Sequence, residues 1–314
     1  MGILVIGSFM MDLVVRTPRA PQSGETIIGH SFSKFPGGKG ANQAVAAARL
    51  GGSVTMAGKV GTDEYGQTAL QTLEKEKINT QNILKDDEHA TGVGFITLEE
   101  SGSNRIIVVP GANLAYTVPN LDEIKSRIKS SKVLVLQLEM DLEMIEQAVS
   151  YAASFDVPVI LNPAPAQKLE DSLLRKVTYL TPNESEAELL TGMKITSLED
   201  AEAAGKLLLG KGVKNVIITL AEKGSLIVTE SGTAHVPGYT VNLVDSVAAG
   251  DSFNGALAVG IAQGKPLDEI VQFANAVGAL TVTKEGAIPS LPYLSEVEDF
   301  MNKNKELAKL KNND

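Results

Sequence analysis

The stretch Asp245–Gly255 combines small residues with a carboxylate in a way that suits phosphoryl transfer. Ala248, Ala249 and Gly250 come directly before Asp251, and an Ala- and Gly-rich helix is expected to follow. Small residues at a helix start leave backbone amides free to bind an anion where charge develops. A carboxylate beside such a site repels the anion, so Asp251 makes sense as a base that takes the proton of a hydroxyl nucleophile. The alternative is that Asp251 only caps the helix.

A second stretch, Pro36–Asn42, precedes the Ala-rich segment Gln43–Leu50, which is predicted to be helical. Consecutive glycines let the backbone approach a ligand closely, and Lys39 and Asn42 can add side-chain hydrogen bonds at the start of the helix. The stretch is not a P-loop, because Gly40 follows Lys39 where that motif needs Ser or Thr. The alternative is a purely structural turn between a strand and a helix.

A third stretch, Thr181–Glu186, offers oxygen ligands for a metal. Asn183 and Glu186 could hold a hydrated Mg²⁺ on nucleotide phosphates, because magnesium sheds its water reluctantly. The alternative is structural, since Asn183 could cap a helix whose positive end would suit Glu184 and Glu186.

The elements that must position these residues alternate along the chain. The strand-like runs 133–136 and 157–161 flank a helical pattern over 142–154, and a helical pattern over 198–209 precedes the strand 216–219. Such alternation predicts βαβ crossovers and a mostly parallel sheet with helices on both faces, the α/β class.

Two early segments break the alternation. The runs 13–17 with 25–33, and 92–98 with 105–109, have the pattern of paired strands joined by polar turns. No helical pattern accompanies them, so we expect a small sheet that projects from the main domain. Its apolar face would need a ligand or another subunit against it.

Composition narrows the classes of function. The 314 residues carry a net charge of −10, which argues against nucleic acid and anionic membranes as partners. Zero Cys excludes disulfides, thiolate metal sites and a Cys nucleophile. No stretch approaches the roughly 20 apolar residues of a membrane helix, and Asp12 interrupts the apolar N-terminus after Ile3–Ile6. We therefore expect a cytoplasmic enzyme.

Together, the three stretches in this order resemble the ribokinase (PfkB) family of carbohydrate kinases. The resemblance extends from Ile3 to Gly286–Ser290, and Gly37–Asn42 and Asp245–Gly255 carry it. It implies one ribokinase-like domain over 1–314 with a Rossmann-like core that binds ATP. It also implies a small β-sheet lid, formed by about 12–34 and 91–110, that closes over the sugar and pairs with the lid of a second subunit in a homodimer.

The resemblance further implies roles for single residues. Asp251 is implied as the base that activates the terminal 5-hydroxyl of a pentose, while the amides of Ala248, Ala249, Gly250 and Asp251 stabilise the transferring phosphoryl group. The positions that match sugar contacts are Asp12, Gly38, Lys39, Asn42 and Glu139. The positions that match ATP contacts are Asn183, Thr219, Ala221, Glu222, Gly224, Gly250 and Asn275.

Metal sites are also implied by the resemblance. Asn183 and Glu186 would hold Mg²⁺ through water. A monovalent cation, expected to be K⁺, would sit beside the amides and offset the acidic surroundings. Its matching positions are Asp245, Val247, Thr281, Lys284, Gly286 and Ser290.

Two residues depart from the family pattern. Members commonly have Gly where this chain has Ala221, so ATP binding should be somewhat weaker if that position needs a positive φ. Ribokinases typically carry an Asn aimed at a sugar hydroxyl where this chain has Met10. Because Met10 cannot make that bond, a buried ribose hydroxyl would go unpaired at a cost of about 1–3 kcal/mol.

A sugar without the 2-hydroxyl would instead place a CH₂ against the thioether of Met10, which packs well. Met10 therefore favours 2-deoxy-D-ribose as the substrate. D-ribose remains the alternative, if Met10 only packs under the lid while Asp12, Lys39 and Asn42 hold the sugar.

Functions of other classes are less favoured. A dinucleotide oxidoreductase shares the alternating architecture, but Gly7–Asp12 lacks the GxGxxG pattern after the first strand. A non-catalytic sugar sensor on a kinase fold is the stronger rival, although Asp251 and the small residues before it argue that catalysis is retained.

Overall fold

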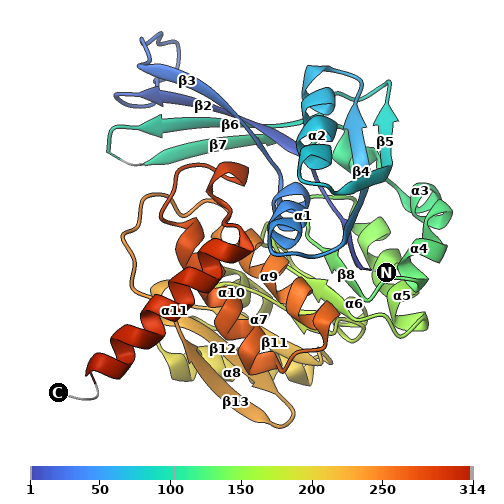
Figure 1. Ribbon diagram of the computed structural model, residues 1–314. Helices are drawn as coiled ribbons and strands as arrows, with labels where there is room; N and C mark the ends of the chain where they lie inside the picture. The colour runs from blue at the N-terminus through green and yellow to red at the C-terminus, as the bar shows by residue number, and fades with distance from the viewer. Residues whose placement is uncertain (1, 102, 312–314) are drawn as a thin grey trace.

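The main sheet forms the centre of the protein. The computed structural model describes residues 2–101 and 103–311, and within these residues the main sheet has nine strands in the order β13-β12-β11-β10-β9-β8-β1-β4-β5 (Figure 1). Only the β11–β12 and β12–β13 pairs are antiparallel. The strands are β1 (Ile3–Ile6), β4 (Val54–Gly61), β5 (Asn79–Asp86), β8 (Val133–Leu136), β9 (Val159–Leu161), β10 (Tyr179–Leu180), β11 (Asn215–Thr219), β12 (Gly224–Thr229) and β13 (Gly232–Pro237).

Helices lie between these strands in the chain or follow β13. Those between the strands are α1 (Lys39–Arg49), α2 (Glu64–Lys75), α3 (Val118–Glu123), α4 (Lys125–Lys129), α5 (Leu142–Ser154), α6 (Asp171–Leu174), α7 (Glu184–Thr191) and α8 (Leu198–Gly210), and those after β13 are α9 (Ala249–Gln263), α10 (Leu267–Thr281) and α11 (Leu294–Lys311). The described part of the chain also forms the short 3₁₀ helices η1 (Gly111–Ala115), η2 (Ala221–Lys223) and η3 (Ile288–Ser290).

The sheet has a hydrophobic core on each face, as alternating side chains require. In β1, Leu4 and Ile6 join the core under α3, α5, α7 and α8, whereas Ile3 and Val5 join the core under α1, α2, α9 and α10. Because the central strands β1, β8 and β9 are buried on both sides, their sequences are continuous apolar runs. The predicted α/β architecture is thereby confirmed.

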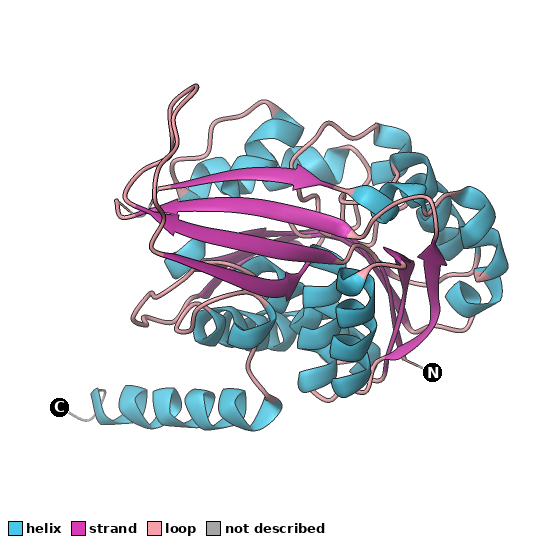
Figure 2. Cartoon of the chain, turned by 90° about the horizontal axis from the view of Figure 1, so that it is seen from above, coloured by secondary structure: helices cyan, strands magenta, loops and turns pink. Residues whose placement is uncertain are grey.

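A separate four-stranded sheet has the order β3-β2-β6-β7, with β2 (Met10–Thr17), β3 (Ser31–Gly37), β6 (Gly92–Glu99) and β7 (Asn104–Val109). Figures 1 and 2 show it as a distinct layer beside the main body. Its exposed apolar side chains are Ile28, Phe32, Phe95, Ile106, Ile107, Val108 and Val109. The projecting small sheet is thus present, while residue 102 of its predicted second segment lies outside the described residues.

The strand predicted over 25–33 was wrong in its bounds. β3 instead begins at Ser31 and pairs antiparallel with β2 until Gly37 lies opposite Met10. Pro36 is tolerated because β3 is an edge strand, where one side of the backbone needs no partner. The glycine-rich stretch therefore begins within a strand, which leads the chain straight to the start of α1.

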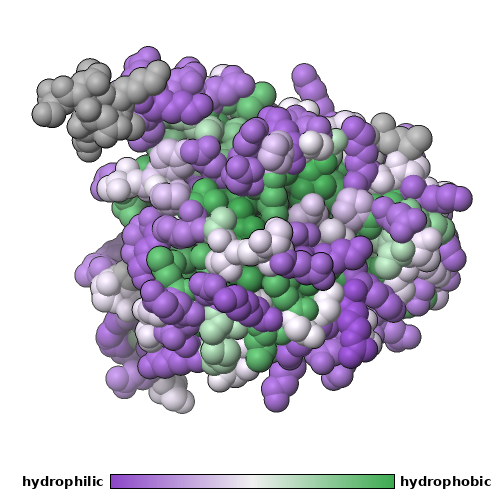
Figure 3. Space-filling model, turned by 90° about the horizontal axis from the view of Figure 1, so that it is seen from below, coloured by the Kyte–Doolittle hydropathy of each residue, from purple (hydrophilic) through white to green (hydrophobic). Residues whose placement is uncertain are grey.

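The face in Figure 3 is dominated by hydrophilic residues with small apolar patches between them, as the net charge of −10 leads one to expect. Within residues 2–101 and 103–311, no helix has both the length and the apolar character needed to span a membrane. The cytoplasmic location stays a prediction.

Candidate active site

Close backbone contacts seat the start of α1 on the end of β1. A Cβ atom on Gly40 would lie 2.5 Å from the carbonyl carbon of Gly7, so neither residue leaves room for a side chain. Gly38, the residue before α1, has φ 94° and packs against the backbone of Met10. A Cβ atom on Gly38 would lie only 2.7 Å from the Met10 amide nitrogen. These contacts place Lys39, the first residue of α1, at the end of the central strands.

The start of α9 has the geometry of an anion site. Ala248 precedes the helix with φ 62°, a left-handed conformation that favours Gly over a residue with a Cβ. In the described chain, the amides of Gly250 and Asp251 donate to no backbone carbonyl. A left-handed residue followed by free helix-start amides forms a concave nest of N–H groups.

One cavity of about 180 Å³ brings the predicted stretches together. It is lined by Lys39, Asn162, Ala164, Thr181, Asn183, Glu186, Thr219, Ser246, Ala248, Ala249, Gly250, Asp251 and Asn254. Residues from all three stretches are present. Asn162 lies outside the three predicted stretches, whereas Thr181 and Asn254 lie within them but had no predicted role; Asn162 and Thr181 directly follow β9 and β10. Polar residues after parallel strands were the available signal, because ligands bind at the carboxyl ends of such strands.

Asp251 lines this cavity and is buried, with 6% of its surface exposed. Its Oδ2 accepts a hydrogen bond from Asn42 Nδ2 at 2.9 Å, and its Oδ1 accepts one from Gln43 Nε2 at 3.0 Å. Burial alone would lower the pKa of the Lys39 ammonium, but Asp251 and Glu139 outweigh it and raise that pKa above its ordinary value. The site therefore holds a lysine cation among several carboxylates.

Asp12 lies on β2 between glycines of the neighbouring strands. A Cβ on Gly37 would come within 2.7 Å of its Oδ2, and a Cβ on Gly94 within 2.6 Å of its Oδ1. Burial, followed by the charges of Glu139 and Asp251, raises the pKa of Asp12 to about 6, against a lowering effect of Lys39. The two glycines thus leave open space around the Asp12 carboxylate. Burial and the neighbouring carboxylates make its charged form unfavourable.

Glu139 is fastened to the start of α1. Its Oε2 accepts hydrogen bonds from Ser8 Oγ at 2.5 Å and from the Lys39 amide at 2.9 Å, and the Gly40 amide donates to Ser8 Oγ at 3.3 Å. A carboxylate at a helix N-terminus is stabilised by the helix dipole. Glu139 therefore fixes the glycine-rich turn, and Ser8 is a partner that the sequence reasoning missed.

Asn183 and Glu186 form a reciprocal cap on α7. The Asn183 amide donates to Glu186 Oε2 at 2.9 Å, and the Glu186 amide donates to Asn183 Oδ1 at 2.8 Å. The structural alternative for this stretch is therefore confirmed, while both residues also line the cavity. Burial raises the pKa of Glu186, against the lowering effects of the Asn183 amide and Lys39.

The acidic groups suit a metal held through water better than one held directly. In the part of the chain that the structure describes, no three His, Cys, Asp or Glu side chains cluster closely enough to enclose a metal ion. Mg²⁺ commonly keeps several waters and binds one or two carboxylates plus substrate phosphates. Glu186 beside the helix-start amides fits that mode.

The positions matched to a monovalent cation lie on two loops that Asp245 joins. Its Oδ1 accepts from the Val247 amide at 3.0 Å and its Oδ2 from the Gly286 amide at 2.9 Å. Thr281 Oγ1 donates to Ser252 Oγ, and Ser290 Oγ donates to the Ala287 carbonyl, so both hydroxyl protons are used within the protein. Lys284 turns its ammonium to Glu296. Because the Thr281 and Ser290 hydroxyls donate their protons within the protein, their oxygen lone pairs, like the backbone carbonyl oxygens of the two loops, could bind a cation.

The positions matched to ATP divide into two groups. Thr219 bridges to Asn183 beside the cavity. Ala221 has φ 50° at the start of η2, which also contains Glu222, and Gly224 follows with φ 95°.

Asn275 is not brought to the cavity. Its Nδ2 donates to the carbonyls of Val236 and Pro237, and its Oδ1 accepts from Ser225 Oγ. Its side chain therefore joins α10 to β12 and β13.

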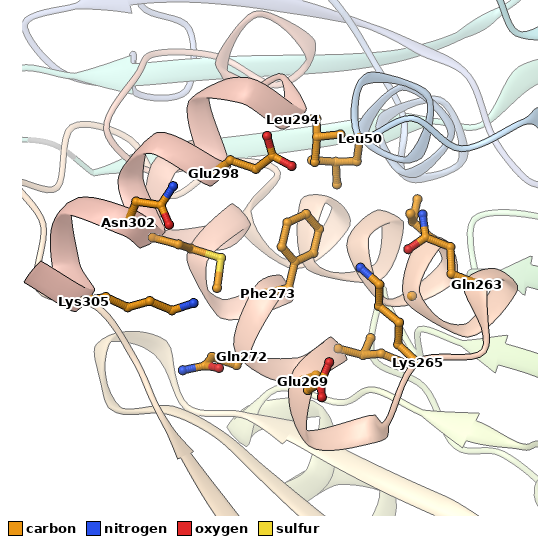
Figure 4. Close-up of a pocket in the computed structure, with 14 residues that line it drawn as sticks. Leu50, Gln263, Lys265, Glu269, Gln272, Phe273, Leu294, Glu298, Asn302 and Lys305 are labelled. Atoms are coloured by element: carbon orange, nitrogen blue, oxygen red, sulfur yellow. The ribbon is translucent and has the colours of Figure 1, made fainter.

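A larger cavity of about 650 Å³ lies between α9, α10 and α11, away from these residues (Figure 4). Phe273 lies near its centre, with Lys265 and Glu269 on one side and Glu298 on another. None of the residues predicted for sugar, ATP or metal lines it. Cavity size alone would therefore point away from the predicted residues.

A carboxylate, a lysine and free helix-start amides around one cavity, on an α/β fold with a small second sheet, define a small-molecule kinase. Comparison with known families agrees, because the pfkB family of carbohydrate kinases matches residues 2–294. The chain belongs to this family.

Individual relatives cover nearly the whole chain. A ribokinase of Haemophilus influenzae is 38% identical, covering 95% of this chain and 98% of that protein. A deoxyribokinase of Salmonella typhimurium is 37% identical, covering 97% and 100%. The structure of an Arabidopsis thaliana ribokinase complexed with ribose and ATP is 30% identical with a TM-score of 0.91, covering 95% and 97%. Ribokinases and deoxyribokinases are both among the relatives at similar identity, so identity alone does not choose between the two sugars.

Proposed function

We propose that the protein transfers the terminal phosphoryl group of ATP to the 5-hydroxyl of a pentose, with 2-deoxy-D-ribose favoured over D-ribose. The choice of sugar rests on the presence of Met10 where ribokinases typically carry an Asn. Met10 is buried, with 3% of its surface exposed, and stands two residues before Asp12 on β2. Because side chains alternate along a strand, the thioether and the Asp12 carboxylate lie on the same face.

The magnitude follows from hydrogen bonding. A sugar hydroxyl buried against the thioether of Met10 would lose its bond to water without a replacement, at a cost of about 1–3 kcal/mol. At about 1.4 kcal/mol per factor of ten, this is about 5- to 150-fold in catalytic efficiency. The CH₂ of 2-deoxyribose would carry no such cost.

In the proposed reaction, Asp251 acts on the sugar. Its carboxylate accepts the proton of the 5-hydroxyl while that oxygen attacks the terminal phosphorus and the bond to the bridging oxygen of ADP breaks. The free amides of Gly250 and Asp251 hold the phosphoryl oxygens, and Lys39 adds a positive charge. The proton then leaves Asp251 to solvent, which restores the carboxylate.

Metal ions would support the phosphates. Mg²⁺ would be held through water by Asn183 and Glu186, and would neutralise phosphate charge when bound. K⁺ would take oxygens from the two loops that Asp245 joins, next to the start of α9.

The small sheet is proposed to serve as the lid and to pair with the same sheet of a second copy. Phe32, Phe95 and Ile107 are 56%, 45% and 65% exposed, and register puts Phe95 opposite Ile107. A contiguous exposed apolar surface of this kind favours a protein partner. Closure would exclude water from the transferring phosphoryl group.

The choice of sugar is tested by the ratio of kcat/KM on 2-deoxyribose to that on ribose, measured in a coupled assay of ADP formation. Met10→Asn should shift this ratio toward ribose by about 5- to 150-fold. A ratio that stays unchanged in the variant would refute the role of Met10. If the native protein forms no ADP with any pentose, but a pentose raises its melting temperature, the protein is a sensor.

A further inference from the structure

The side of Asp251 that faces the interior contacts a chain of buried amides that the reaction above does not use. Gln43 on α1 and Gln137 after β8 are both 0% exposed. Gln43 Nε2 donates to Asp251 Oδ1 at 3.0 Å and to Asn162 Oδ1 at 3.2 Å. Gln137 Nε2 donates to Gln43 Oε1 at 2.7 Å. Both amide protons of Gln43 and its carbonyl oxygen are therefore in use.

The direction of the Gln43 amide is determined by its neighbours. Asn162 Nδ2 donates to the Thr181 carbonyl, which turns Asn162 Oδ1 toward Gln43. A reversed Gln43 would place its own oxygen against that oxygen and against Asp251 Oδ1, with no proton between them. Gln43 is thus oriented to present an N–H to the carboxylate.

Keeping these amides in the core is unfavourable for stability. Gln137 Oε1 is one of the buried atoms without a hydrogen-bond partner among the described residues, and an unpaired buried amide oxygen costs free energy. A Cβ on Gly7 would approach the same oxygen to 2.2 Å, so the packing there also depends on a glycine. Apolar side chains of similar volume in place of Gln43 and Gln137 would avoid the unpaired oxygen. Packing alone therefore does not explain the two buried amides.

That role is to hold the Asp251 carboxylate. The terminal torsion of an aspartate is soft, so the planar group rotates easily unless both oxygens are held. Asn42 holds one oxygen, but it is also matched to a sugar contact and has an Oδ1 without a partner in the described structure. Gln43 is the contact to Asp251 that a bound sugar does not reach, because it has no exposed surface.

We infer that Gln43 is a positioning residue for phosphoryl transfer, and that Gln137 holds Gln43 in turn. Gln43 fixes Oδ1 of Asp251 so that the other oxygen meets the sugar hydroxyl at the angle needed for proton transfer. The inference rests on the proposed role of Asp251 as the base, but it does not depend on which pentose is the substrate.

The test uses the full-length protein and whichever pentose it phosphorylates best. Gln43→Met keeps the length of the side chain and removes both N–H donors. We expect kcat to fall about 10- to 100-fold, as a misplaced catalytic group would cause, while KM for ATP changes less than about threefold. Gln137→Met leaves both donors of Gln43 in place, and kcat should fall only about two- to fivefold.

A double-mutant cycle separates positioning from a general loss of structure. In an Asp251→Asn background, Gln43→Met should lower the residual rate less than about twofold, because the group it positions is already disabled. Val149→Ala, in the core on the other face of the sheet, is the control for lost stability and should leave kcat unchanged.

Two results would overturn the inference: a folded Gln43→Met protein with kcat within twofold of the native protein, or an equal loss in the native and Asp251→Asn backgrounds. If Gln43→Met does not fold, Gln137→Met decides by the same two criteria. Full activity of Asp251→Asn would instead refute the proposed base, and with it the function of the site, whatever Gln43 does.

Discussion

Replacing Asp12 with Asn should stabilise the sugar-free protein while abolishing sugar binding. The Asp12 carboxyl has a pKa of about 6 in the folded protein, against 3.8 as its ordinary value. Between these two values the folded protein binds more protons than the unfolded chain, so its stability falls as the pH rises through this window and stays low above it. An uncharged Asn escapes that loss.

The difference of about two pH units corresponds to at most about 3 kcal/mol. Asp12 is only half-buried, and screening by solvent reduces the gain to about 1–2 kcal/mol at pH 8. About half of the gain should remain at pH 5, where the Asp12 carboxyl of the folded protein is mostly protonated.

The assay measures the free energy of unfolding at pH 5 and at pH 8 for three proteins: the native protein, Asp12→Asn and Asp299→Asn. Asp299→Asn is the control, because it removes an exposed carboxylate from α11. Only Asp12→Asn should show a stabilisation that grows between the two pH values. Adding pentose should raise the melting temperature of the native protein and the control, but not that of Asp12→Asn, which lacks the charged acceptor. A destabilised Asp12→Asn, or an equal gain at both pH values, would refute the reasoning.

Three further predictions concern other parts of the protein. Asp251→Asn should lower kcat by about 10²- to 10⁴-fold while pentose still raises its melting temperature; near-native turnover would contradict its role as base. Ala221→Gly should stabilise the protein by about 1 kcal/mol in urea unfolding, because φ is 50° there, and a loss of stability would show that the methyl group packs usefully. Ile107→Asp should convert a dimer to a monomer in light scattering, whereas Leu207→Asp, on α8 and also exposed, should not; equal masses for native protein and Ile107→Asp would contradict pairing through the small sheet.

The sequence predicts the main sheet well because continuous apolar strands and amphipathic helices are local signals. The stretches Pro36–Asn42 and Asp245–Gly255 are also local signals, since each contains both a turn and the start of the helix that follows it. The cavity confirms that Lys39 and Asp251, far apart in the chain, meet at one place. Asn275 does not line that cavity, because its amide is used within the protein, and its contact with ATP stays a prediction.

Other features could not be predicted for physical reasons. Gln43 and Gln137 contact each other only because β8 and α1 meet at the end of β1, and no spacing in the chain reveals that. The bounds of β3 were missed because pairing with β2 determines where it begins, and neither Pro36 nor the following glycine has a strand propensity of its own. The pKa of Asp12 likewise depends on Glu139 and Asp251, which come from distant segments.

The glycines on either side of Asp12 have a consequence for redesign of the proposed sugar site. Positions 37 and 94 carry no functional group, yet any side chain there would occupy the volume around the carboxylate. A library of variants at these two positions should yield almost no active clones, whereas the neighbouring residue Met10 can change to another side chain of similar size. If Asp12 binds the sugar as proposed, the space beside it cannot be filled, and changes of sugar specificity should be made at other residues of the site, such as Met10.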